Sequence, residues 1–141
     1  MKTIWTAIQV AFSTLGGVLG WFFGGLDGFF IVLLAFVVAD YISGVMVAVV
    51  EKRLSSSVGF RGIFRKILIF VLVGVANLLD THVLGTAAVL RTAVIFFYIS
   101  NEGISLLENA GHLGVPYPQK LRDVLAQLHH RSEKNDKEDK Q

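Results

Sequence analysis

Residues 51–66, EKRLSSSVGFRGIFRK, separate two long apolar blocks at residues 4–50 and 63–107. Each block is about twice as long as the roughly 20 residues that one membrane-spanning helix needs. The sequence therefore predicts two helical hairpins in a membrane, joined by a basic loop held at the membrane surface. The basic residues of this stretch are Lys52, Arg53, Arg61, Arg65 and Lys66.

The composition agrees with an integral membrane protein. Of 141 residues, 53% are hydrophobic and 17% are charged, which is too apolar for a soluble domain of this size. The sequence contains no Gly-rich phosphate loop, no metal-ligand cluster and no cysteine nucleophile, so we expect neither an enzyme nor a cofactor. We also expect no nucleic-acid partner, because the basic residues lie beside the predicted spans.

The predicted fold is all-α, with a membrane domain at residues 1–114 whose four spans are residues 4–23, 29–50, 63–79 and 86–107. The short connections after the first and third spans contain no Lys or Arg. Basic residues lie instead before the first span, in residues 51–66 and after the fourth span. The positive-inside rule therefore places both termini and the central loop in the cytoplasm.

Four polar residues interrupt the predicted spans: Asp40, Arg91, Asn101 and Glu102. A charged side chain at the bilayer centre costs about 3 kcal/mol or more, so such residues usually face a partner or water. We predict that these four line a lumen or an assembly face. Asp40 would lie at a depth between Arg91 and Glu102 and could pair with one of them, in its own chain or in another subunit. Two alternatives stay open: Asp40 is hydrogen-bonded within the monomer, or Arg91 and Glu102 mark the edges of a shorter span.

Small residues recur at four-residue spacing on the first two predicted spans, at positions suited to close helix packing in lipid. The alternative for the glycines near residue 24 is that they only form a turn. The five basic residues of the central stretch are expected mainly to set orientation, and they could also bind lipid headgroups. The candidate packing residues are Gly16, Gly20, Gly24, Gly44 and Ala48.

Beyond Pro116 and Pro118, which stop the fourth helix, apolar residues return at helical spacing. Residues 115–130 are predicted to include an amphipathic helix that lies on the membrane surface or packs against a neighbour. Residues 131–141 are charged and without apolar side chains, so we expect them to be disordered.

Several segments together resemble the toxin-secretion/phage-lysis holin family (phage holin family 4). They are ADYISG at 39–44, LSSSVGFRG at 54–62, RTAVIFFYISNEGIS at 91–105 and LENAGHLGVP at 107–116. The resemblance covers about residues 30–128, in the same order and at similar spacing. Asp40, Arg91, Asn101 and Glu102 match polar membrane positions of that family, whereas their assignment to a lumen rests on the cost of burial.

This resemblance implies a small phage or prophage protein of the bacterial cytoplasmic membrane. Such a protein oligomerises with its own copies in the lipid bilayer and forms lesions that release an endolysin or a large toxin. The released protein would be a passenger rather than a bound ligand. Two other classes stay open: a small four-span ion channel or transporter, and an antiholin-like regulator that leaves the bilayer sealed.

Overall fold

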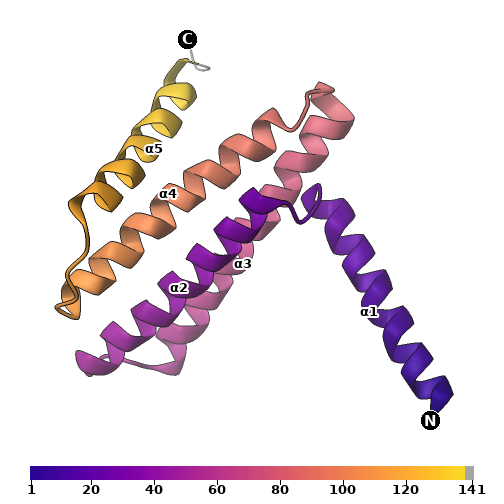
Figure 1. Cartoon of the computed structure of the whole chain (residues 1–141), viewed down its shortest axis with the longest axis horizontal. Coiled ribbons are helices and arrows are strands. Elements are labelled where there is room, and N and C mark those ends of the chain that lie inside the picture. Colours follow the sequence, from indigo (N-terminus) through magenta and orange to yellow (C-terminus); the bar gives the residue numbers. More distant parts are fainter. Residues whose placement is uncertain (139–141) are drawn as a thin grey trace.

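The computed structural model describes residues 1–138, and these form five α-helices with one π-helical turn (Figure 1). The prediction of an all-helical chain is confirmed. The helices are α1 (Lys2–Phe23), α2 (Gly28–Val50), α3 (Ser56–Leu79), α4 (Val89–His112) and α5 (Gln119–Glu138), and the π-helical turn η1 (Asp80–Leu84) continues α3.

Polar side chains fix where the helices begin. Asp27 accepts a hydrogen bond from the Phe30 backbone N–H at 3.0 Å and caps α2, and Ser55 caps α3 in the same way through Val58 at 3.2 Å. The α4 helix is capped from outside, because the Asp80 carboxylate accepts from the backbone N–H groups of Leu90 and Arg91. These caps satisfy amide groups that a helix leaves without partners in its first turn.

The α3 helix begins at Ser56 rather than at residue 63, so the prediction of a loop is wrong for residues 56–62. Only residues 51–55 connect α2 and α3. The Ser55 cap allows the helix to start early, and the glycines that follow it do not break it. Arg61, Arg65 and Lys66 consequently lie on a helix that packs in the bundle.

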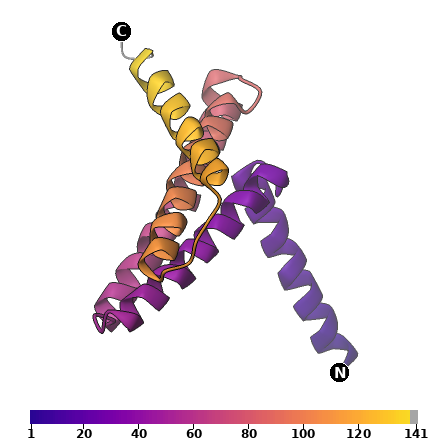
Figure 2. The same ribbon diagram turned by 60° about the vertical axis from the view of Figure 1, so that its left-hand side comes forward.

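The core lies between α2, α3 and α4, which run side by side in both views (Figures 1 and 2). Leu33, Val73 and Ile95, one from each helix, are fully buried there. Phenylalanine rings fill the end of this core nearest the α1–α2 turn, where Phe23 and Phe30 pack with centroids 4.8 Å apart. The α2, α3 and α4 helices therefore form one packed unit.

The α1 helix diverges from this unit and has no buried residue (Figure 2). Its main contact is with α3, where the Phe22 ring lies against Gly74, and Phe23 at its end also packs on Phe30 of α2. A packed first hairpin is therefore not found. Lipid chains can cover the exposed apolar residues of α1 as well as another helix does.

The α5 helix folds back along α4 (Figure 1). Leu125 is 4% exposed, and a Cβ added at Gly103 would lie 2.8 Å from its Cδ2 atom. The predicted amphipathic helix is thus present and packs against α4 of its own chain. It continues to Glu138, so the prediction of disorder is wrong for residues 131–138, whose Lys, Glu and Arg residues favour extension of an existing helix. Residues 139–141 lie outside the described part of the chain.

Three helical segments in the described chain are long and apolar enough to cross a membrane: Lys2–Phe23, Gly28–Val50 and Ser56–Leu84. The first two match predicted spans closely. The third joins α3 with η1. The α4 helix is not among them, since it carries Arg91, Glu102 and Glu108 within 24 residues. The count of four spans and the orientation stay predictions.

Candidate functional site: ionic clusters and the polar face of α4

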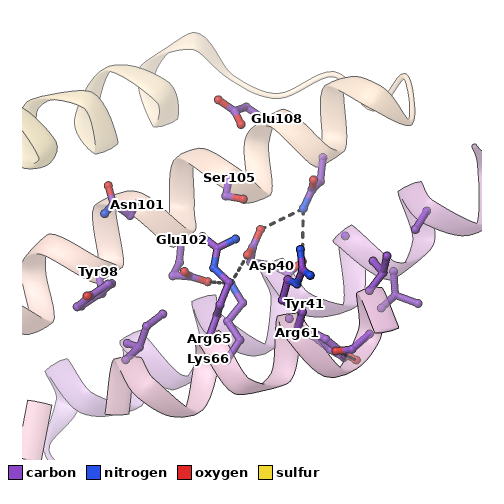
Figure 3. Close-up of a pocket in the computed structure, with 18 of the residues that line it drawn as sticks. Asp40, Tyr41, Arg61, Arg65, Lys66, Tyr98, Asn101, Glu102, Ser105 and Glu108 are labelled. Carbon is purple, nitrogen blue, oxygen red and sulfur yellow. Dashed lines mark hydrogen bonds and ion pairs between the residues drawn. The ribbon is translucent and has the colours of Figure 1, made fainter. Parts of the chain in front are cut away.

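One lysine joins the three helices of the bundle. The Lys66 ammonium group on α3 forms ion pairs with Asp40 Oδ2 on α2 and with Glu102 Oε2 on α4 (Figure 3). The three side chains are only 10–18% exposed. We refer to Asp40, Lys66 and Glu102 as the central ionic cluster.

Asn109 extends the central ionic cluster along α4. Its Nδ2 group donates to Asp40 Oδ1 at 3.0 Å and to Ser43 Oγ at 2.9 Å. Gly44 lies beside this contact, and a Cβ there would be in ordinary van der Waals contact with the same nitrogen, at 3.7 Å. The Asp40 carboxylate therefore has partners on both α3 and α4. Burial of these charges is costly, and the cost is offset only while every member keeps its partner.

The predicted partner of Asp40 was Arg91 or Glu102, whereas its cation is Lys66. This lysine was missed as a partner because the basic residues of the central stretch, Lys66 among them, were assigned to orientation and lipid headgroups. A signal was available: Lys66, Ile69 and Val73 follow one another at spacings of three and four residues. Ile69 and Val73 are buried, so Lys66 stands in register with the core face of α3.

A second ionic cluster, formed by Asp27 and Arg91, holds the start of α4 against the turn between α1 and α2. Arg91 Nη1 donates to Asp27 Oδ2 at 2.8 Å, and Nη2 donates to Asp27 Oδ1 at 3.2 Å and to the Gly25 carbonyl at 2.9 Å. Arg91 is 3% exposed. The hydrogen bond from Arg91 is the main cause that lowers the pKa of Asp27 below its ordinary value, with the Phe30 amide acting in the same direction.

Gly24 allows this second cluster to form. Its φ of 76° is in the left-handed region that glycine adopts readily. A Cβ at this position would lie 2.2 Å from Asn77 Oδ1 and 2.9 Å from Arg91 Nε. Asn77 Nδ2 donates to the carbonyls of Trp21 and Phe22, which also holds the end of α1 against α3. Gly24 therefore serves both as a turn residue and as a point of close approach.

The α4 helix also carries polar residues outside both clusters. Tyr98, Asn101, Ser105 and Glu108 follow at spacings of three and four residues, so they share one face of the helix, which we call the α4 polar face. All four line a cavity of about 960 Å³ between α2, α3 and α4 (Figure 3). Asn101, Ser105 and Glu108 make no side-chain hydrogen bond or ion pair with another described residue. Their polar groups are left for water or another molecule.

The other predicted site residues are distributed as follows. Gly16 and Gly20 have no atom within 4 Å of an added Cβ, and Ala48 is buried on α2. Arg53 pairs with the neighbouring Glu51, whose carboxylate also lies 3.4 Å from His112 Nδ1. No group of three His, Asp or Glu side chains in the described chain is arranged to hold a metal ion.

These features define an all-helical protein with three potential membrane-crossing segments and with charges paired inside the helical bundle. The chain belongs to the bacteriophage holin family, whose model matches residues 17–130.

Relatives occur in several Gram-positive bacteria. An uncharacterized 14.9 kDa protein from the nagH 3′ region of Clostridium perfringens is 42% identical over 131 residues, which is 93% of this chain and 99% of that protein. An uncharacterized protein of Listeria innocua is 41% identical over 93% of this chain and 96% of its own. The uncharacterized protein YqxH of Bacillus subtilis is 35% identical over 92% and 91%. No solved structure matches the chain.

Proposed function

We propose that this protein is a holin that oligomerises in the bacterial cytoplasmic membrane and forms lesions through which an endolysin or a large toxin leaves the cytoplasm. Membership of the bacteriophage holin family, three potential membrane-crossing segments and bacterial relatives support this proposal. Oligomerisation, the cytoplasmic membrane as location and the released passenger are parts of the proposal.

The α4 polar face is the observation that most strongly supports the proposed holin function. A polar group transferred to hydrocarbon without a partner costs on the order of 2 kcal/mol or more, and an ionised carboxylate costs more. Asn101, Ser105 and Glu108 have no partner in the described chain. A second copy can supply partners while the membrane is sealed, and water can supply them once copies surround a hole. Dense assemblies would thus favour an open, water-lined state.

In this proposal α4 is the fourth span. The residues of its polar face, which would face a second copy or water rather than lipid, are the reason that its composition is too polar for a lipid-covered span. Asp40 and Glu102 were predicted to line a lumen or an assembly face, and we propose a different role for them in the central ionic cluster. Asp40 and Glu102, held by Lys66, keep α2, α3 and α4 together as one unit. Of the four residues predicted to line a lumen, Asn101 is the one we propose to face water.

The α1 helix would supply contacts between copies. It projects from the bundle with Gly16 and Gly20 uncovered, and small residues at this spacing allow helices to approach closely in lipid. A helix that leaves its own bundle is free to cover a neighbour. We therefore assign the first assembly contact to α1 and the lumen to α4.

The proposal is tested by induced expression in a bacterium with a co-expressed cytoplasmic endolysin. A quiet interval followed by abrupt depolarisation and endolysin-dependent lysis is expected. The double substitution Asn101→Leu with Glu108→Leu should delay or abolish lysis, whereas the control Asn101→Gln with Glu108→Gln keeps a polar face and should retain most of it.

Three results would contradict the proposal. Depolarisation without release of the endolysin indicates a small ion channel or transporter. A membrane that stays energised at high, verified protein levels indicates a regulator or scaffold. Lysis by the leucine variant with wild-type timing, at equal expression, removes the α4 polar face from the mechanism.

A further inference from the structure

One face of α3 presents cations and then apolar side chains to the cavity. Arg61, Arg65, Leu68 and Leu72 follow at spacings of four, three and four residues, and all four line the cavity of about 960 Å³. Leu68 and Leu72 are 59% and 44% exposed, although they are large apolar residues. The order along the helix is therefore positive charge first and exposed hydrocarbon second.

The charges of the two arginines are not balanced within the described part of the chain. Arg61 and Arg65 form no ion pair or side-chain hydrogen bond with another described residue. Lys66, the third cation of this region, is already held by Asp40 and Glu102. Glu108 also lines the cavity, but it forms no ion pair with either arginine. Arg61 and Arg65 are thus the cations of the cavity that remain available to an anion.

The depth of the two arginines can be estimated from the length of the helix. The segment Ser56–Leu84 has 29 residues, or about 43 Å of helix, against a hydrocarbon core of about 30 Å. Its apolar part, residues 67–79, is interrupted only by Asn77 and spans about 20 Å. Arg61 and Arg65 precede this part and so fall at the level of the lipid headgroups, while Leu68 and Leu72 fall beside the acyl chains.

We propose that this face of α3 is a binding site for an anionic phospholipid. Arg61 and Arg65 hold the phosphate of the headgroup through charge-assisted hydrogen bonds, and Leu68 and Leu72 seat the start of an acyl chain. The acidic pair of the central ionic cluster is already held by Lys66 and does not compete for the two arginines. Free phosphate could bind the two arginines as the headgroup does, but it has no apolar part that would contact the exposed leucines. Lipid binding at this site does not require lesion formation, so its test can succeed or fail independently of the test of the proposed function.

The test uses the full chain in nonionic detergent, with bound lipids counted by native mass spectrometry. Phosphatidylglycerol should bind about tenfold or more tightly than phosphatidylcholine. The double substitution Arg61→Gln with Arg65→Gln should lower affinity for phosphatidylglycerol by about tenfold or more, because each hydrogen bond to a charged group contributes on the order of 1.5 kcal/mol. Arg61→Lys with Arg65→Lys should be intermediate, since lysine keeps the charge without the planar fork.

A matched control removes two charges elsewhere, by Lys2→Gln with Lys120→Gln, and should bind within about twofold of the wild type. Equal losses in the control and the arginine variant would mean that overall charge alone attracts the lipid, which would overturn the site. Glycerol phosphate, which lacks acyl chains, is added as a competitor. If it displaces the lipid at concentrations close to those of the lipid itself, the ligand is a free phosphate and the lipid assignment fails.

Discussion

Lys66 forms an ion pair with Asp40 across 26 positions of sequence, and the same ammonium group reaches Glu102 another 36 positions along the chain. Lys66, a residue of the basic stretch at 51–66, therefore lies at the centre of the bundle. Three largely buried charges from three helices meet there. The stability of the α2–α3–α4 unit should therefore depend on the three residues jointly.

Replacing Lys66 with methionine should lower the free energy of unfolding by about 3–5 kcal/mol, because two carboxylates are left close together without a cation. Thermal unfolding in detergent, followed by circular dichroism, measures this loss. Adding Asp40→Asn and Glu102→Gln to the same variant should restore much of the stability, because no unpaired charge then remains. Arg65→Met, at an exposed neighbouring position, is the control, and equal losses at Lys66 and Arg65 would contradict the role of the cluster.

Acidification should weaken the contact between Asp27 and Arg91. The pKa of Asp27 is lowered in the folded chain, so its ionised form stabilises the fold above the ordinary carboxyl pKa. That contribution is lost as the pH falls through the lowered value. Asp27 is 44% exposed, which limits the effect to about 1 kcal/mol or less. The Asp27→Asn variant should lack this part of the pH dependence of the unfolding temperature, and parallel curves for both proteins would disprove it.

Gly103 should control whether α5 stays docked on α4. A leucine at this position would collide with Leu125, which is packed against Gly103, and with Phe36. Gly103→Leu should therefore increase proteolytic cleavage between α4 and α5, at residues 113–118, by about tenfold or more. Gly111→Leu on the same helix is the matched control, because an added Cβ meets nothing within 4 Å there. Equal cleavage of the two variants would show that Leu125 does not hold α5.

Gly16 and Gly20 should matter for assembly and not for the fold of one copy. A Cβ added at either position has no atom within 4 Å, so with leucine at both the unfolding temperature in detergent should stay within a few degrees of the wild type. Cross-linked oligomers in membranes should decrease several-fold, because the helices no longer approach closely. Gly17→Leu, on another face of α1, is the control. Unchanged cross-linking in the double variant would exclude this face from assembly.

Much of the helical framework was predictable. The predicted spans at residues 4–23 and 29–50 agree closely with α1 and α2, because long apolar runs are bounded by Gly24, Gly25 and the Asp27 cap. The start of α3 was misplaced because a charged stretch between apolar blocks is typical of a loop, whereas Ser55 caps a helix there. The helical part of the tail was missed because charge was weighed above the helix propensity of its residues.

The sequence by itself determined the all-helical class, three potential membrane-crossing segments and the presence of costly charges among apolar residues, because composition and periodicity are local properties. Only the tertiary structure decided that Lys66 neutralises Asp40 and Glu102, that Arg91 holds Asp27 and that α1 leaves the bundle. Partner choice depends on which helix faces meet and at what depth. That is set by the packing of all the helices together, and lipid covers an apolar helix as readily as a neighbouring helix does.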